Sequence, residues 1–282
     1  MRFGAHMYLW ADTWSDKSLY LIDHVKTLGL DCFEIGFGDE LEFTASHTRD
    51  KAKDAGVELI VSPGGIWPME ADISCEDADN QRKGLAWHKR AIDMTASVEA
   101  SAYTGALYGH PGHVERRLPT TDEFKRTSEH LNTLAEYAQV RGINLVLEPM
   151  SHFRTHMVNR PDQAMSLIEM TNHPNLLVLL DTYHLVTEIR NYAEAVHTVG
   201  DKLWGIHACE NDRGAPGGGI VPWESFFKAL KETNFKGYMG VESYNSGSLE
   251  MAPKRGLFNN PCPDGDAFVK HSLAFFSQMM KE

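Results

Sequence analysis

The chain contains few cysteines, and none are close together in the sequence. Only four of its 282 residues are cysteine, and none form a CxxC pair: Cys32, Cys75, Cys209 and Cys262. This scatter argues against a disulfide framework and against a zinc ribbon. Because thiols are ordinarily reduced in the cytoplasm, we predict a cytoplasmic protein.

Long hydrophobic runs and an excess of basic residues are also missing. No window approaches the roughly 18 apolar residues of a membrane span, and the segment Met1–His6 lacks the apolar core of a signal peptide. The formal net charge is −12, whereas nucleic acids and anionic membranes attract Lys and Arg. We therefore expect neither nucleic acid nor a membrane as partner.

What the chain does contain is a regular alternation of short apolar runs and amphipathic segments. We predict strands at 3–9, 32–35, 58–62, 102–107, 145–148, 176–181, 203–207 and 238–242. Helices are predicted at 17–28, 45–55, 79–100, 121–140, after Pro161, and at 192–199, 223–233 and 267–280. Eight strand–helix pairs suit a (β/α)8 barrel of about 250 residues. The predicted fold is therefore an α/β TIM barrel, one domain over residues 1–282.

Four successive predicted strands end in a residue that binds metals: Glu148, Asp181, His207 and Glu242. Their separations of 33, 26 and 35 positions each fit one helix, one strand and two loops. The carboxyl ends of barrel strands share one face, and a buried ionised carboxylate is costly unless it is paired or coordinated. We therefore predict that the four bind one divalent cation.

Each of these residues also has an ordinary structural explanation when taken alone. Asp181 is suited to cap the next helix, His207 to hydrogen-bond within the core, and Glu242 to form a salt bridge. The combination of three carboxylates and one imidazole favours Mn²⁺, with Co²⁺ or Mg²⁺ possible, over the thiolate sites of structural zinc.

Two further residues lie where a chelating substrate would need contacts. His184 is one turn beyond Asp181, and Arg213 is in the loop after His207. Either is equally acceptable as a surface residue at a helix start. The glycine-rich loop at 214–219 lacks the lysine of a phosphate-binding loop, so it is weak evidence for a nucleotide. Glu34 lies inside a predicted strand, which is unusual for a carboxylate.

With these motifs together, the chain resembles the sugar phosphate isomerase/epimerase superfamily of xylose isomerase-like barrels. The similarity to its D-tagatose/D-allulose (psicose) 3-epimerase branch runs end to end. It rests on Leu147-Glu148-Pro149, Leu180-Asp181-Thr182-Tyr183-His184, Ile206-His207, 211–217 and Val241-Glu242, and on Gly4, Trp10, Trp14, Leu28-Gly29, 34–36 and 105–108.

The resemblance implies an isomerase-type enzyme, a metal-dependent ketose 3-epimerase. It implies that Glu148 and Glu242 are the acid/base pair as well as metal ligands, and that His184 and Arg213 hold substrate oxygens. The cation would stabilise the enediolate formed between removal and return of the proton. Trp14 and His6 are further candidate substrate contacts. By analogy we expect a homodimer or homotetramer, and a small sugar as the only other partner.

Three positions depart from that branch. Arg154 stands where a second glutamate is usual, His6 where a tyrosine is common, and His110-Pro111 where an aromatic pair is found. These changes leave the predicted proton chemistry intact and alter the pocket wall. Arg154 is suited to receive a carboxylate or phosphate, although it is also acceptable as an exposed loop arginine.

Three alternatives remain open. One is another enediolate enzyme on the same scaffold, either an aldose–ketose isomerase or an enzyme acting on 3-keto-glycosides, such as a C-glycoside deglycosidase subunit. A second is a DNA-repair endonuclease with a zinc cluster, for which His110 and His113 would be extra ligands. A third is a barrel that binds sugar or acts as a scaffold without catalysis.

Overall fold

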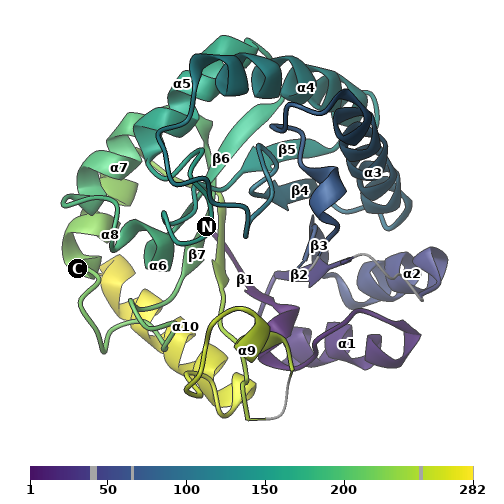
Figure 1. The fold of residues 1–282 in the computed structure, drawn as a ribbon. Helices are drawn as coiled ribbons and strands as arrows, with labels where there is room; N and C mark the ends of the chain where they lie inside the picture. Colours follow the sequence, from purple (N-terminus) through teal and green to yellow (C-terminus); the bar gives the residue numbers. More distant parts are fainter. Residues whose placement is uncertain (39–42, 65–66, 248–249, 282) are drawn as a thin grey trace.

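Eight parallel strands close into a barrel, and helices surround it (Figure 1). The computed structural model describes residues 1–38, 43–64, 67–247 and 250–281. The strands are β1 (Arg2–His6), β2 (Cys32–Gly36), β3 (Glu58–Ser62), β4 (Ala102–Gly105), β5 (Asn144–Leu147), β6 (Leu176–Asp181), β7 (Leu203–Ala208) and β8 (Tyr238–Val241). Their order in the barrel is their order in the chain, and β8 pairs with β1. The predicted TIM barrel is thus confirmed.

The helices follow the predicted rhythm closely. They are α1 (Tyr20–Thr27), α2 (Ala45–Ala55), α3 (Ala78–Ser97), α4 (Thr121–Gln139), α5 (Pro161–Thr171), α6 (Thr182–Leu185), α7 (Tyr192–Val199), α8 (Trp223–Glu232), α9 (Met251–Lys254) and α10 (Gly265–Lys281). Local chemistry sets their ends: Thr120 and Glu123 form a capping box at the start of α4, and Gly56 closes α2 with a φ of 63°.

Several predicted boundaries were wrong, including the end of the third helix, which is Ser97 and not residue 100. The first strand ends at His6 because residues 7–9 form a 3-10 turn. The first helix begins later, at Tyr20, after a separate 3-10 turn over residues 16–18. The fourth strand ends at Gly105, where a φ of 130° takes the backbone out of the strand conformation. The short helix α9 was not predicted, whereas α6 is the helix that Asp181 was suited to cap, and the Asp181 side chain accepts from the backbone nitrogen of Tyr183 at its start.

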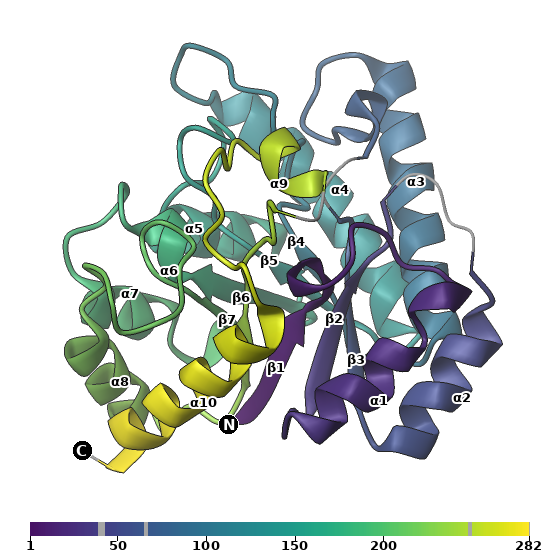
Figure 2. The ribbon, with the colours of Figure 1, turned by 90° about the horizontal axis from the view of Figure 1, so that it is seen from below.

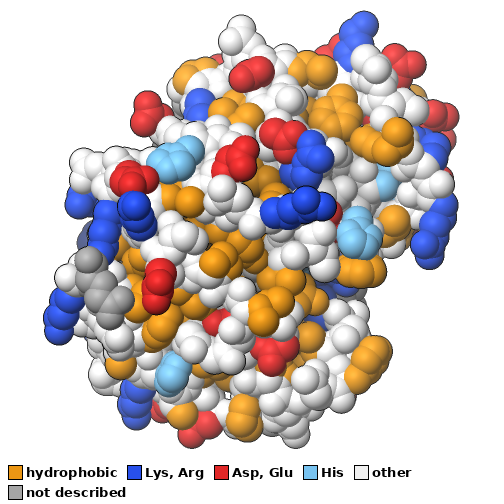
Figure 3. Space-filling model, turned by 90° about the vertical axis from the view of Figure 1, so that its left-hand side faces the viewer, with side chains coloured by type: hydrophobic (Ala, Val, Ile, Leu, Met, Phe, Trp, Pro, Cys, Tyr) orange, Lys and Arg blue, Asp and Glu red, His pale blue; other side chains and the backbone are white. Residues whose placement is uncertain are grey.

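The loops that follow the strands gather at one end of the barrel, and both chain ends lie at the other (Figure 2). Helix α9, in the loop after β8, lies over that first end. None of the described helices combines the length and apolarity needed to cross a membrane. On the described part of the face shown in Figure 3, acidic and basic side chains are interspersed, so this face offers no continuous basic surface.

Two buried clusters support the strands. The larger lies between the strands and the helices, while the smaller draws one residue from each of seven strands: Cys32, Ile60, Ala102, Val146, Leu179, Trp204 and Tyr238. Side chains alternate along a strand. Positions two residues beyond three members of this cluster therefore share its face of the sheet, and they are Glu34, Glu148 and Asp181. Glu242 lies four residues beyond Tyr238 and so has the same parity in its strand. The inner cluster therefore lies inside the barrel beneath the polar residues.

Candidate metal centre and pocket

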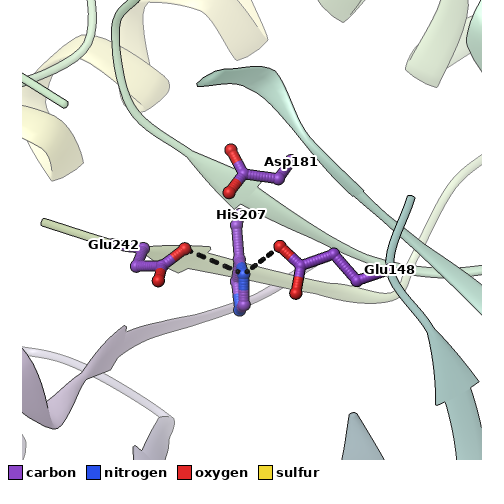
Figure 4. A group of neighbouring side chains, drawn as sticks. All are labelled: Glu148, Asp181, His207 and Glu242. Carbon is purple, nitrogen blue, oxygen red and sulfur yellow. Dashed lines mark ion pairs between the residues drawn. The ribbon is translucent and has the colours of Figure 1, made fainter. Parts of the chain in front are cut away.

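The four predicted metal ligands lie together at the carboxyl ends of adjacent strands. Asp181 ends β6, and it pairs in register with His207 near the end of β7. Glu148 and Glu242 directly follow β5 and β8. All four are buried, and each offers a ligand atom within 4.8 Å of those of the others. The two glutamates approach His207 from opposite sides (Figure 4).

The imidazole of His207 is held with one nitrogen toward this group. Its Nε2 lies 2.8 Å from Glu34 Oε2, so Nε2–H donates to that carboxylate. Its Nδ1 lies 3.5 Å from Glu148 Oε1 and 3.2 Å from Glu242 Oε2, and this buried atom has no hydrogen-bond partner in the described residues. In that tautomer Nδ1 presents a lone pair to the carboxylates, as a metal-ligating histidine does.

Three carboxylates in so small a space repel one another. Burial raises the pKa of Asp181 to about 8, and the neighbouring Glu242 and Glu148 add to this effect. Burial also opposes ionisation of Glu242, but Arg213 and His207 outweigh it and hold the pKa of Glu242 well below its usual value. Arg213 Nη1 lies 2.7 Å from Asp181 Oδ2 and 2.9 Å from Glu242 Oε2. The three carboxylates therefore require a nearby positive charge if all of them are to be ionised.

The protonation of His207 points the same way. Burial disfavours the imidazolium, yet the carboxylates of Glu34 and Glu242 raise the pKa of His207 well above its ordinary value. A divalent cation would supply the charge that this proton otherwise provides. Three carboxylates and one imidazole are mostly hard oxygen donors, so the residues present fit Mn²⁺, Mg²⁺ or Co²⁺.

A pocket of about 70 Å³ opens beside three of these residues, Glu148, His207 and Glu242. Four of the five predicted substrate contacts line it: His6, Arg154, His184 and Arg213. Trp14 is not among the lining residues. Its indole is buried against Phe33 and donates from Nε1 to Thr48 Oγ1 at 3.0 Å, so it supports the wall from behind.

The predicted contacts are themselves fixed in place. His184 Nδ1 lies 3.3 Å from the backbone nitrogen and from the hydroxyl of Ser151, and its Nε2 lies 3.3 Å from Arg213 Nη2. The ring of His6 stacks on Tyr8 with centroids 4.2 Å apart, and its Nε2 lies 3.4 Å from Ser62 Oγ. Preorganised polar groups of this kind suit the recognition of hydroxyl and carbonyl oxygens.

Several site residues were not predicted. Glu34 was noted as unusual but was given no role, although a carboxylate within a buried strand is itself a sign of a buried partner. Tyr244, whose hydroxyl donates to Glu242 Oε1 at 2.8 Å, and Arg255 both come from the loop after β8. That loop has no regular hydrophobic periodicity, so its sequence does not indicate where these two side chains point.

The chain is similar to known epimerases over nearly its whole length. The model of the xylose isomerase-like TIM barrel family matches residues 22–276. The D-psicose 3-epimerase of Agrobacterium fabrum is 28% identical over 86% of this chain and 85% of its own length. The L-ribulose 3-epimerase of Methylomonas sp. is 27% identical over 99% and 97%. A crystal structure of D-allulose 3-epimerase from Methylomonas sp. in complex with D-allulose superposes with a TM-score of 0.92, at 26% identity, covering 99% of this chain and 97% of that one.

Proposed function

Because the chain belongs to the xylose isomerase-like TIM barrel family, we propose that it is a divalent-metal-dependent ketose 3-epimerase. Family membership confirms the resemblance predicted from the sequence. The relatives are named epimerases, and one similar structure contains D-allulose. The chain is therefore a carbohydrate epimerase, and the position of the reaction, the cation and the substrate belong to the proposal.

The observation that carries the proposal is the placement of two carboxylates on opposite sides of one imidazole (Figure 4). Inverting a carbon beside a ketone requires that a proton leave one face and return to the other. In the proposed reaction, Glu148 and Glu242 serve opposite faces of a sugar bound between them. Either can act as base when ionised and as acid once it has taken the proton.

The remaining groups bind and orient the sugar. His184 and Arg213 would donate to its oxygens, and the Tyr244 hydroxyl holds the Glu242 carboxylate by its hydrogen bond. Glu148, Asp181, His207 and Glu242 would hold Mn²⁺, or alternatively Co²⁺ or Mg²⁺. When bound, that cation would act as a Lewis acid that stabilises negative charge on the ketone oxygen.

The test is exchange of hydrogen with solvent at C3. The Mn²⁺-loaded protein is incubated with D-fructose or D-tagatose in D₂O, and NMR follows deuterium and the C3 epimer. We expect both to appear, and Glu148→Gln and Glu242→Gln each to slow them by about 10²–10⁴-fold. Glu224→Gln, an exposed residue of α8, is the matched control that should retain the wild-type rate.

The two sugar-processing alternatives give different results in exchange experiments of this kind, and the endonuclease alternative has its own assay. Deuterium at C1 with formation of an aldose indicates an isomerase, and exchange only in a 3-keto-glycoside indicates the glycoside-processing reaction. Cleavage of abasic DNA would indicate the endonuclease. Absence of deuterium at C3 from every keto sugar offered would overturn the proposal.

A further inference from the structure

Two arginines line the pocket away from the four metal ligands. Arg154 comes from the loop after β5, and Arg255 directly follows α9 in the loop after β8. Both are partly buried, so the explanation of Arg154 as an exposed loop residue does not hold. Two loops that are far apart in the sequence thus each place a guanidinium at the same pocket.

Neither guanidinium has a carboxylate partner within the described residues. Arg255 Nη2 donates to the carbonyl of Gly64 at 3.1 Å, while its buried Nε has no hydrogen-bond partner there. The described hydrogen bonds of Arg154 involve only its backbone. Most other arginines described here are paired, as Arg213 is with Asp181 and Glu242.

The charge of Arg255 also acts on Arg154. Burial disfavours the charged form of Arg255 itself, but nearby Tyr244 and Tyr8 outweigh this effect and raise the pKa of Arg255. Burial lowers the pKa of Arg154, and the charge of Arg255 lowers it further. Placing two like charges in a partly desolvated pocket costs free energy unless an anion joins them. The acidic residues that line this pocket are Glu34, Glu148 and Glu242, and these already contact His207 or Arg213. Among the described residues, the pocket lining therefore supplies no negative charge that is free to offset these two arginines.

We propose that Arg154 and Arg255 bind an anionic group on the sugar, so that the substrate is an acidic keto sugar rather than a neutral one. This inference rests on the proposed function and names its substrate class. A guanidinium presents a planar set of donors that matches the oxygens of a carboxylate or a phosphate. Tyr183 and Tyr244 line the same pocket.

The first measurement is binding without turnover. The Mn²⁺-loaded protein is titrated by calorimetry with three compounds that cannot enolise: D-glucitol, D-glucitol 6-phosphate and D-gluconate. We expect one of the two anions to bind at least about tenfold more tightly than D-glucitol. Preference for the phosphate identifies a sugar phosphate, and preference for gluconate identifies a sugar acid. Equal affinity for all three overturns the inference.

Variants separate the arginines from direct binding of the anion to Mn²⁺. In Arg154→Gln, Arg255→Gln and the double variant, the ratio of anion to D-glucitol affinity should fall, by at least tenfold in the double variant. Arg190→Gln, an exposed arginine outside the pocket, is the matched control that should keep the wild-type ratio. A ratio that the double variant leaves unchanged would also overturn the inference.

Catalysis gives an independent measurement. In D₂O, kcat/KM for exchange at C3 is compared for D-fructose, D-fructose 6-phosphate and D-fructuronate. An advantage of at least about tenfold for an anionic sugar, lost in the double variant, supports the inference. Equal exchange in all three leaves the epimerase proposal intact and removes the anion site. No exchange in any removes the epimerase proposal, while the calorimetric ratio still decides whether the arginines bind an anion.

Discussion

At the scale of single residues, the decisive pair is a carboxylate and an imidazole. Glu34 is fully buried, and besides His207 it accepts from Thr104 Oγ1 at 3.2 Å. Burial alone would favour the neutral acid, but His207 and His6 outweigh it and lower the pKa of Glu34. The ionised Glu34 therefore fixes the direction of Nδ1 of His207, a residue of the group that could hold a cation.

We expect Glu34→Gln to weaken Mn²⁺ binding by about 10–100-fold, because a neutral amide keeps the shape but not the charge that orients His207. Calorimetric titration of the metal-free protein with Mn²⁺ measures the change. Glu136→Gln is a matched control, since Glu136 contacts His173 Nε2 at 3.2 Å in a glutamate–histidine pair outside the pocket. An unaltered Kd in Glu34→Gln would show that this carboxylate does not tune the site.

At the scale of elements, most of the barrel could be predicted because its helices and strands follow local rules. Apolar runs of four to six residues formed the strands, and glycines closed the helices where expected. The metal-type residues were found because each ends such a run. The failures lie where a single backbone angle or a long-range contact decides the outcome. Apolar Ala106 and Leu107 continue the pattern of β4, but the φ of Gly105 ends that strand.

The pocket wall was less predictable than the metal ligands for the same reason. Tryptophan is a residue type that often contacts sugars. Whether the indole of Trp14 faces the pocket or the core, however, depends on Thr48 in α2, which is distant in sequence. Arg255 reaches the pocket only because the loop after β8 folds back over the barrel (Figure 2). The local sequence pattern does not indicate the orientation of either side chain.

The end of β4 can be tested directly. We expect Gly105→Ala to destabilise the protein by about 1–3 kcal/mol, because alanine is strained at a φ of 130° and its Cβ would lie 3.3 Å from Pro63 Cδ. Urea unfolding measures the change in free energy. Gly218→Ala is the control, since no atom lies within 4 Å of its added Cβ and its φ is not positive. Equal stability of the two variants would refute this account of the strand end.

At the scale of the whole molecule, the stability of the fold should depend on the pH through a buried histidine that is not one of the predicted metal ligands. His88 of α3 is fully buried against the rings of Trp67 and Trp87, and its Nδ1 lies 3.0 Å from the Tyr103 hydroxyl in β4. Burial lowers the pKa of His88 from 6.5 to about 3. The helix layer is therefore joined to the barrel through an imidazole that must stay neutral.

This depressed pKa fixes the sign of the effect. Between about pH 3 and 6.5 the unfolded chain binds a proton at His88 that the folded chain does not. Stability must therefore rise with pH through that window and be complete above it. From pH 8 to pH 5 the contribution lost by acidification is about 2 kcal/mol. We expect His88→Gln, which has no proton to gain, to lose correspondingly less stability over the same interval.

Urea unfolding at pH 5 and pH 8 measures the difference between the two proteins. The comparison cancels other titrating groups, including Asp181, whose raised pKa acts in the opposite direction. His197→Gln, an exposed histidine of α7, should keep the wild-type dependence. If His88→Gln loses as much stability as the wild type on acidification, the imidazole is protonated in the folded state, and its surroundings must supply a counter-charge.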